Sequence, residues 1–203
     1  MQPINEHTGT AMVLARDDVD TDQIIPAEYC RKVTRTGFAD ALFARWRADP
    51  GFALNDPNRA GATILVAQRN FGTGSSREHA VWALWDWGFV CVIASSFGDI
   101  FRSNAPKNGV VPIELPDDAV TALAEAAQAD STLQITVDLQ NVEVRYGTSR
   151  VPFEFEPWAR SMLLNGFDDI DLTLDHEYGI DCYEIGRPRW LPKIGPALLE
   201  ELE

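Results

Sequence analysis

Residues 63–94 read TILVAQRNFGTGSSREHAVWALWDWGFVCVIA. The largely apolar runs at 63–67 and 89–94 are typical of strands that are buried on both faces. A glycine-rich turn at 70–76 follows the first run, and apolar side chains then recur on one face over 77–87, which predicts a helix. Strand, helix and strand at this spacing predict a βαβ unit with parallel strands.

Further elements are predicted on both sides of this unit. We expect strands over 11–15, 110–113, 133–139, 142–146 and 151–156, and helices over 38–48, 96–105 with Ser96 as its cap, 117–129, and from Pro157 to 165–166. The last three strands alternate apolar and polar residues, which is typical of an antiparallel meander with one face in water. Residues 1–10 are polar, and we expect them to be loosely held. The predicted fold class is α/β: a parallel βαβ core with added antiparallel strands, in layers.

Composition and charge exclude several classes of protein. The 203 residues include 17 Lys or Arg and 31 Asp or Glu, a net charge of −14 that repels nucleic-acid phosphates. The longest run without charge, 87–98, is shorter than the ~20 residues that span a bilayer, and no secretion signal is visible. We therefore expect a cytoplasmic protein without nucleic-acid or membrane partners. One domain over 1–186 and a proline-rich carboxy-terminal arm over 187–203 are predicted.

The metal-binding side chains form no recognisable ligand set. Cys30, Cys91 and Cys182 include no C-x-x-C pair, and the three histidines include no H-E-x-x-H. The acidic stretch 18–22 resembles the start of a calcium loop, but Gln23 stands where such a loop needs glycine. We therefore predict no metal site in this chain, and a solvated turn at the acidic stretch.

The turn at 70–80 has the properties of an anion site. Free backbone N–H groups and the positive end of the predicted helix favour a negative ligand there. Gly74 lets the backbone approach a ligand closely, and the planar guanidinium of Arg77 suits a carboxylate. Ser75 would act as a base only as an alkoxide, which requires a strong local positive potential. A purely structural interpretation also fits, because Ser75 and Glu78 have the spacing of a capping box.

A basic loop stands out in this acidic chain. Arg31, Lys32 and Arg35 lie within five residues. Such a loop is either solvated or a mobile clamp for an acidic substrate, and the residues alone leave both interpretations open.

Four segments, in the same order, resemble the swivelling domain of the aconitase superfamily. They are 70–80 (NFGTGSSREHA), 18–26 (DVDTDQIIP), 96–109 (SFGDIFRSNAPKNG) and 163–174 (LLNGFDDIDLTL). The resemblance covers roughly residues 10–185 and implies a swivelling β/β/α fold. It also implies a hydro-lyase shared with a separate large subunit, which carries a [4Fe-4S] cluster on its own cysteines; this chain would bind no cofactor.

The resemblance also implies roles for individual residues. By position in the motif, Ser75 is the base that removes a carbon-bound proton, Arg77 grips a substrate carboxylate, and Gly74 and Ser76 lie beside the substrate. The branch that fits best interconverts 2-isopropylmalate and 3-isopropylmalate through 2-isopropylmaleate, in leucine biosynthesis.

In shorter relatives, the residues after the tyrosine help to choose the side group of the substrate. Here Tyr29 and Cys30 are followed by Arg31, Lys32, Val33 and Thr34, which we expect to contact the diacid. Because two cations would also suit an acidic side group, a citraconate, methylmalate or homoaconitate type of hydro-lyase remains an alternative. A non-catalytic anion-binding module and self-association of the isolated chain also stay open.

Overall fold

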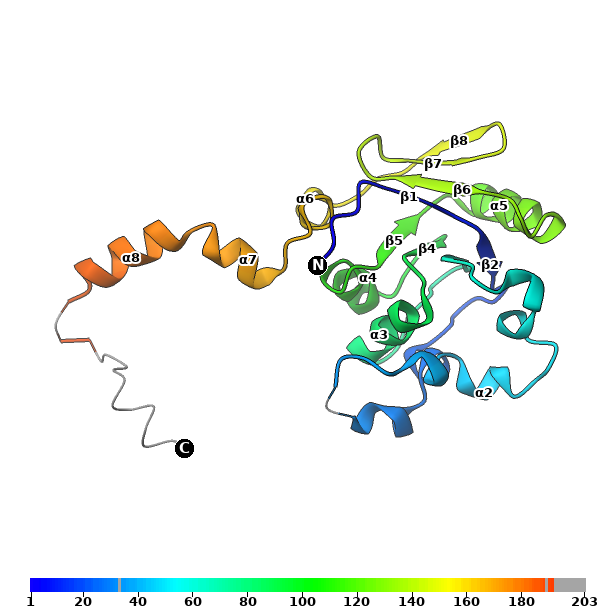
Figure 1. Cartoon of the computed structure of the whole chain (residues 1–203), viewed down its shortest axis with the longest axis horizontal. Coiled ribbons are helices and arrows are strands. Elements are labelled where there is room, and N and C mark those ends of the chain that lie inside the picture. The colour runs from blue at the N-terminus through cyan, green and yellow to red at the C-terminus, as the bar shows by residue number, and fades with distance from the viewer. Residues whose placement is uncertain (33, 189, 192–203) are drawn as a thin grey trace. The chain divides into compact units, whose positions relative to one another are not determined.

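Two sheets of four strands organise the larger part of the chain (Figure 1). The structure is a computed structural model that describes residues 1–32, 34–188, 190 and 191. It divides into two units, Met1–Phe167 and Asp168–Glu203, and both sheets belong to the first unit.

The first sheet is parallel throughout. Its strands, in spatial order, are β2 (Ala11–Val13), β3 (Ile64–Val66), β4 (Cys91–Ala94) and β5 (Val111–Glu114). Helix α3 (Glu78–Trp87) connects β3 to β4, and α4 (Asp99–Lys107) connects β4 to β5. The predicted βαβ unit is confirmed, and Gly88 ends α3 in the left-handed conformation (φ 112°) that glycine tolerates.

The second sheet is antiparallel and contains one strand that we did not predict. Its order is β1 (Glu6–Gly9), β6 (Ile135–Asp138), β7 (Glu143–Tyr146) and β8 (Ser149–Pro152). The expectation that residues 1–10 are loosely held is wrong, because β1 pairs with β6 and the amino-terminal ammonium donates to the Gly166 carbonyl at 2.7 Å. No apolar run marks β1, since one of its faces is exposed.

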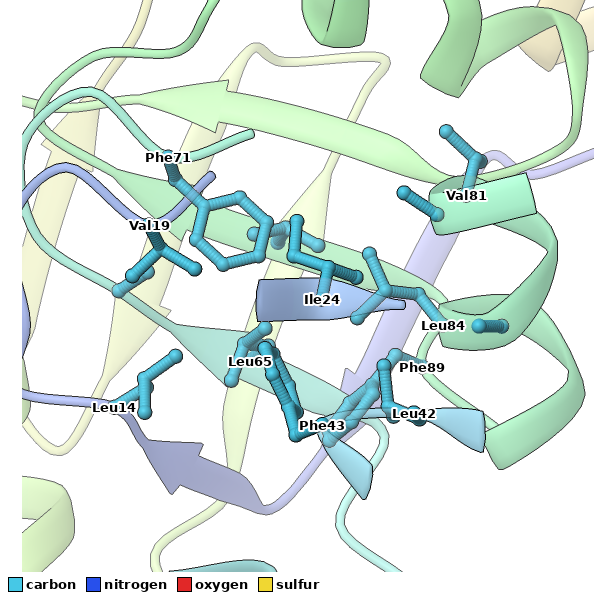
Figure 2. Packing of buried hydrophobic residues seen from close by; sticks show 14 of the residues in the cluster. Leu14, Val19, Ile24, Leu42, Phe43, Leu65, Phe71, Val81, Leu84 and Phe89 are labelled. Atoms are coloured by element: carbon cyan, nitrogen blue, oxygen red, sulfur yellow. The ribbon is translucent and has the colours of Figure 1, made fainter. Parts of the chain in front are cut away.

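Apolar cores on the two faces of the parallel sheet create three layers. Strand residues such as Met12, Leu65 and Val92 point to one core, which also receives side chains from α3 and α4. Figure 2 shows Leu65 of β3 with Val81 and Leu84 of α3 in this core. Their neighbours point to a second core, which contains side chains from α5 (Asp117–Ala129) and from the antiparallel sheet. Continuous apolar strands are required here because both faces of the parallel sheet are covered.

Short helices complete the first unit: α1 (Thr21–Ile24), η1 (Ala27–Arg31), η2 (Ala39–Ala41), α2 (Ala44–Arg47), η3 (Ala53–Asn55), η4 (Pro57–Arg59) and α6 (Pro157–Asn165). The predicted helix over 38–48 is wrong. Phe43 is left-handed (φ 47°) and donates its backbone N–H to Ile24 at 2.7 Å, which divides the segment into two short turns. Ser96 does not cap α4, since the N-cap is Gly98 and the Ser96 hydroxyl accepts from the Asn70 backbone at 2.9 Å.

The second unit contains the helices α7 (Asp169–Leu174) and α8 (Glu177–Gly186). Neither helix has a buried residue. Most of the arm expected over 187–203 lies outside the described residues, so its extent stays a prediction. In the part of the chain that the structure describes, no helix is both long and apolar enough to cross a membrane.

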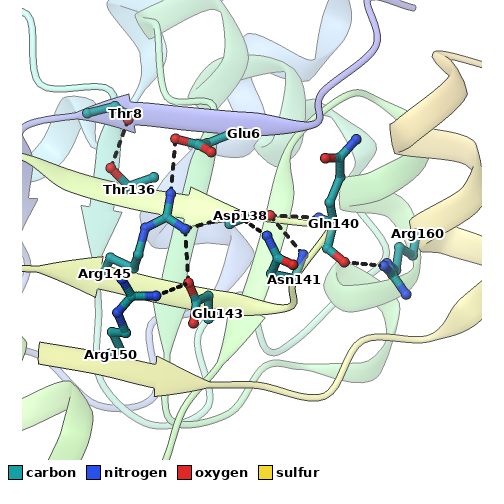
Figure 3. Close-up of polar contacts among 10 residues, drawn as sticks. All are labelled: Glu6, Thr8, Thr136, Asp138, Gln140, Asn141, Glu143, Arg145, Arg150 and Arg160. Atoms are coloured by element: carbon teal, nitrogen blue, oxygen red, sulfur yellow. Dashed lines mark hydrogen bonds and ion pairs between the residues drawn. The ribbon is translucent and has the colours of Figure 1, made fainter.

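A polar network covers the antiparallel sheet around the buried carboxylate of Asp138 (Figure 3). This carboxylate accepts hydrogen bonds from the backbones of Gln140 and Asn141, from the Asn141 amide, and from Arg145 at 3.0 Å. Burial alone raises the pKa of Asp138, but these hydrogen bonds outweigh it and the pKa is lowered. The carboxylate therefore fixes the turn between β6 and β7.

Replacing this carboxylate should destabilise the protein in a pH-dependent way. Asp138→Asn places an amide NH₂ against the donors of Asn141 or Arg145, so we expect a loss of about 2 kcal/mol in the free energy of unfolding at pH 7. Because the folded pKa is lowered, the contribution of Asp138 is present above the unfolded pKa of ~3.9 and is lost as the pH falls through the folded value.

Denaturant unfolding at pH 7, 5, 4 and 3 measures this effect. The difference between the wild type and Asp138→Asn should shrink toward pH 3, while the exposed α5 control Glu125→Gln changes stability little at any pH. A constant difference across this range would contradict the assignment.

Candidate active site

The glycine-rich turn lies at the carboxyl edge of the parallel sheet. Three segments meet there, each following a strand: 14–22 after β2, 67–77 after β3 and 95–98 after β4. Isolated bridges join Asp20 to Thr73 and Phe71 to Phe97. Ligands of open α/β sheets bind at this edge, because the loops after neighbouring strands converge there.

Backbone contacts shape the turn. The Gly72 N–H donates to the Val19 carbonyl at 2.7 Å, and Gly72 itself has a positive φ of 74°. A Cβ on Gly72 would collide with the ring of Phe101, and a Cβ on Gly98 would lie 2.7 Å from the Gly72 carbonyl oxygen. The glycines are therefore required by close backbone packing as well as by conformation.

Ser75 lies exposed at the end of this turn, and among the described residues its hydroxyl has one side-chain partner, Thr21. The Thr21 hydroxyl, on a residue that is 3% exposed, donates to the Ser75 carbonyl at 3.0 Å and lies 3.3 Å from the Ser75 hydroxyl. The capping-box interpretation is wrong. The N-cap of α3 is Arg77, which makes no side-chain cap, so the Ser75 hydroxyl does not cap the amino-terminal end of this helix.

Three backbone N–H groups, of Ser75 and of the two residues after it, have no partner in the described part of the chain. Within residues 1–32 and 34–188, no protein acceptor pairs with the N–H groups of Ser75, Ser76 or Arg77. These groups precede the first turn of α3, whose own N–H groups carry the positive end of the helix dipole. The turn can therefore stabilise a negative charge with backbone groups that need no rearrangement.

Arg77 is held in a fork by Asp22. Its Nη2 donates to Asp22 Oδ2 at 2.9 Å, its Nη1 pairs with Asp22 Oδ1, and Nη1 also donates to the Ile25 carbonyl at 3.3 Å. The hydrogen bond from Arg77 lowers the pKa of Asp22, and the Asp22 carboxylate raises the pKa of Arg77. Among the described residues no acceptor pairs with Arg77 Nε, so the Nε edge of the guanidinium is available to a ligand.

Cys30 lies close enough to this pair for both charges to act on its thiol. Burial raises the pKa of Cys30, the Arg77 cation opposes this, and the Asp22 carboxylate adds to it. The thiol therefore stays protonated at neutral pH and is a poor nucleophile. Its position shows that the segment just before the basic loop borders the glycine-rich turn.

The basic loop lies along the first half of α3. Lys32 Nζ donates to the Gly37 carbonyl at 2.8 Å and lies 5.5 Å from the centre of the Phe38 ring, which meets His79 edge-on at 5.3 Å. Arg35 lies 6.0 Å from the centre of a Trp82 ring. Cation–π contacts of this kind tie the loop to the helix that follows Arg77.

The predicted site residues are thus only partly brought together. Gly74, Ser75, Ser76 and Arg77 form one site. Arg31 and Thr34 are exposed on the neighbouring loop, where the Thr34 hydroxyl donates to the Thr36 carbonyl at 2.9 Å. Val33 lies outside the described residues. Contact between the loop and a substrate stays a prediction.

The acidic stretch forms the other half of the site, where we expected a solvated turn. Asp18 accepts from the Asn70 amide at 2.8 Å, Asp20 caps α1 by accepting from the Gln23 backbone at 2.8 Å, and Asp22 holds Arg77. Sequence reasoning assigned no role to Thr21 or Asp22. The signal that could have identified them was their place in the segment 18–26, which resembles the aconitase superfamily.

The donor set of this chain does not fit an iron–sulfur cluster. Cys30, Cys91 and Cys182 lie in η1, β4 and α8, and the thiol of Cys91 is fully buried, which raises its pKa. No group of three or more His, Cys, Asp or Glu side chains is placed to hold a metal in the described part of the chain. No step of the chemistry below therefore passes through a metal held by this chain.

The close approach at Gly98 predicts a cost for any side chain there. Gly98→Ala forces a Cβ against Gly72 and Thr73, at 2.7–2.8 Å, so we expect a loss of about 1–3 kcal/mol in the free energy of unfolding. Gly51→Ala is the matched control, since its Cβ would meet only Asp49 Oδ1 at 3.5 Å. Urea unfolding measures both variants, and equal stabilities would contradict the packing described here.

Comparison with known proteins identifies the family of this chain. The family model for the aconitase C-terminal domain matches residues 1–118. Relatives named 3-isopropylmalate dehydratase small subunit from Parafrankia sp. and Acidothermus cellulolyticus are 54% and 55% identical over 192 residues, which is 95% of this chain and 98% of each relative. The crystal structure of a 3-isopropylmalate dehydratase from Methanocaldococcus jannaschii superposes with a TM-score of 0.66 at 28% identity, covering 87% of this chain and 98% of that one. The chain therefore belongs to the aconitase C-terminal domain family, among the small subunits of 3-isopropylmalate dehydratase.

Proposed function

We propose that this chain is the small subunit of a two-chain hydro-lyase that interconverts 2-isopropylmalate and 3-isopropylmalate through 2-isopropylmaleate, in leucine biosynthesis. The relatives, 52–55% identical, carry the name of this enzyme. The observation in the structure that carries the proposal is the exposed Ser75 hydroxyl beside unpaired backbone N–H groups and a fixed guanidinium. Ser75 supplies the base, and Arg77 binds a carboxylate of the substrate.

In this reaction Ser75 Oγ, as an alkoxide, accepts the carbon-bound proton, and the electron pair of that C–H bond forms the double bond of the maleate. The hydroxyl on the neighbouring carbon leaves with the electron pair of its C–O bond, as hydroxide. Hydroxide then adds to the carbon that lost the proton, the proton returns from Ser75 to the other carbon, and the isomer and the Ser75 alkoxide are formed. A [4Fe-4S] cluster on the large subunit would supply Lewis-acid chemistry for the departing hydroxyl.

Thr21 and the backbone allow Ser75 to act as the base. While the Thr21 hydroxyl donates to the Ser75 carbonyl, its oxygen can accept from the neutral Ser75 hydroxyl, 3.3 Å away. When Ser75 is an alkoxide, the Thr21 hydroxyl can turn and donate to it instead, and the N–H groups of Ser76 and Arg77 add further stabilisation. The backbone N–H groups need no reorganisation to stabilise the anion, and only the Thr21 hydroxyl has to rotate.

Asp22 positions Arg77 for a substrate carboxylate. Because Asp22 occupies both terminal nitrogens of the fork, the guanidinium is fixed and presents its Nε edge. A carboxylate that binds to Nε and to the second N–H of Nη2 is then held by two hydrogen bonds in the plane of the guanidinium, which fixes its direction. The basic loop, with Arg31, Lys32, Val33 and Thr34, would contact the other end of the diacid.

The site is incomplete in this chain alone, which supports a shared cleft. Gly74, Ser75 and Ser76 are exposed, and Arg77 is half-buried. The hollow of about 550 Å³ formed by α4, β5 and residues 154–159 contains no residue of the glycine-rich turn. A surface of the large subunit would have to cover the turn to exclude water from the reaction.

Removing the base tests its role directly. Reconstituted anaerobically with the large subunit, Ser75→Ala should lower kcat by about 10²- to 10⁴-fold, because the variant lacks the hydroxyl that we propose as the proton acceptor. Sedimentation should show normal assembly. The exposed α4 variant Ser103→Ala is the control and should keep wild-type turnover. Near-normal kcat in Ser75→Ala would remove this residue from the mechanism.

The positioning role of Asp22 predicts a split between KM and kcat. Asp22→Asn frees the guanidinium, so KM should rise about threefold to tenfold, which corresponds to ~1 kcal/mol, while kcat changes little.

A double-mutant cycle separates this role from an independent one. If Asp22 acts through Arg77, Asp22→Asn should have little further effect on KM in an Arg77→Ala background. Additive effects on KM would show that Asp22 acts on the substrate by another route.

A further inference from the structure

The second unit exposes large apolar side chains that no core covers. They are Ile170 (68% exposed), Leu174 (57%), Tyr178 (83%), Ile180 (40%), Tyr183 (65%), Ile185 (87%) and Trp190 (80%). The first unit, which is several times longer, exposes only four such side chains among the described residues. Apolar surface gathered in this way marks an interaction site.

Helix α8 presents this surface in an ordered pattern. Positions i, i+4 and i+7 share one face of a helix. One such set is apolar and the neighbouring set is acidic: Tyr178, Cys182 and Ile185 form the apolar stripe, and Glu177, Asp181 and Glu184 form the acidic stripe. The helix is therefore built to contact a surface that is apolar beside a row of positive charges.

Neither helix is long enough to be stable by itself. Helices α7 and α8 have 6 and 10 residues, and isolated helices shorter than ~12–15 residues are marginal in water. Since neither contains a buried residue, both helices need a covering surface for their stability.

The charge of this segment indicates what kind of surface can cover the two helices. Residues 168–186 contain seven carboxylates and no lysine or arginine. A second copy of this chain carries a net charge of −14 and is repelled, as are nucleic acids and anionic lipids. The covering surface is therefore basic and apolar, and it belongs to a different polypeptide.

We propose that α7 and α8, within residues 168–188, form a docking arm that binds a basic, apolar groove on the large subunit. The proposal rests on the proposed function, which requires such a partner. The alignments with the dehydratase small subunits cover 95% of this chain and so include most of the second unit. The arm anchors the large subunit at a surface that contains neither Ser75 nor Arg77.

Titration of the purified chain into its purified large subunit tests the arm. Binding is followed by sedimentation and, separately, by turnover of isopropylmalate. The double variant Tyr178→Ser/Ile185→Ser should raise the Kd for the large subunit at least tenfold, while kcat at saturation stays within twofold of the wild type. Gly179→Ala is the control on the same helix, because nothing lies within 4 Å of its Cβ and it favours the helix; its Kd should be equal or lower.

A second variant tests the charge. The triple variant Glu177→Lys/Asp181→Lys/Glu184→Lys should also raise the Kd. Added salt should weaken the binding of the wild type but not the binding of this variant. An unchanged Kd in both variants would overturn the docking arm, as would a wild-type dimer of the isolated chain that the apolar double variant dissociates. If the wild type binds the large subunit without any turnover, the proposed function fails while the arm is still measured by sedimentation.

Discussion

The candidate site depends on the pairing of two loops that lie 52 to 53 residues apart in sequence. The segment after β2 and the glycine-rich turn after β3 exchange backbone hydrogen bonds, from Gly72 to Val19 and from Thr21 to the Thr73 carbonyl. This pairing brings the Thr21 hydroxyl to Ser75 and the Asp22 carboxylate to Arg77. On its other side the turn packs closely against Phe101 and the 95–98 segment, where Gly72 and Gly98 leave no room for a Cβ.

The charge distribution is compatible with the acidic substrate that we propose. With a net charge of −14, the protein as a whole repels a dianion. Locally, the end of α3, Arg77 and the basic loop oppose this field over a short distance. Asp22 reduces the positive charge of the site, but in exchange it fixes the orientation of the guanidinium. The ion pair therefore weakens the attraction of the site for an anion, but it fixes the direction from which a carboxylate can bind Arg77.

The two units differ in how their apolar side chains are covered. The first unit builds the site on the carboxyl edge of a sheet whose faces are both covered by apolar cores, so the loops start from a rigid base. The second unit has no buried residue in either helix and exposes its apolar side chains. A structure of this kind fits a subunit that supplies part of an active site and relies on a partner for the rest.

Much of the fold could be predicted from local pattern. The apolar runs at 63–67 and 89–94 and the helix between them were correctly identified, since burial on both faces leaves a continuous apolar signal. Strand β1 was missed because a half-exposed edge carries little apolar signal. The helix over 38–48 failed because the contact of Phe43 with Ile24, far away in the chain, overrides the local periodicity.

For the site, the sequence alone determined the chemical groups: a glycine-rich turn, two serines and an arginine before a helix, and a separate acidic stretch. The four ordered motifs were sufficient to name the family. Only the tertiary structure decided that Ser75 pairs with Thr21 instead of capping α3, and that Asp22 holds Arg77. The physical reason is that these pairs join residues 54 and 55 positions apart, and no local preference specifies a contact that parallel strands create by aligning their carboxyl ends.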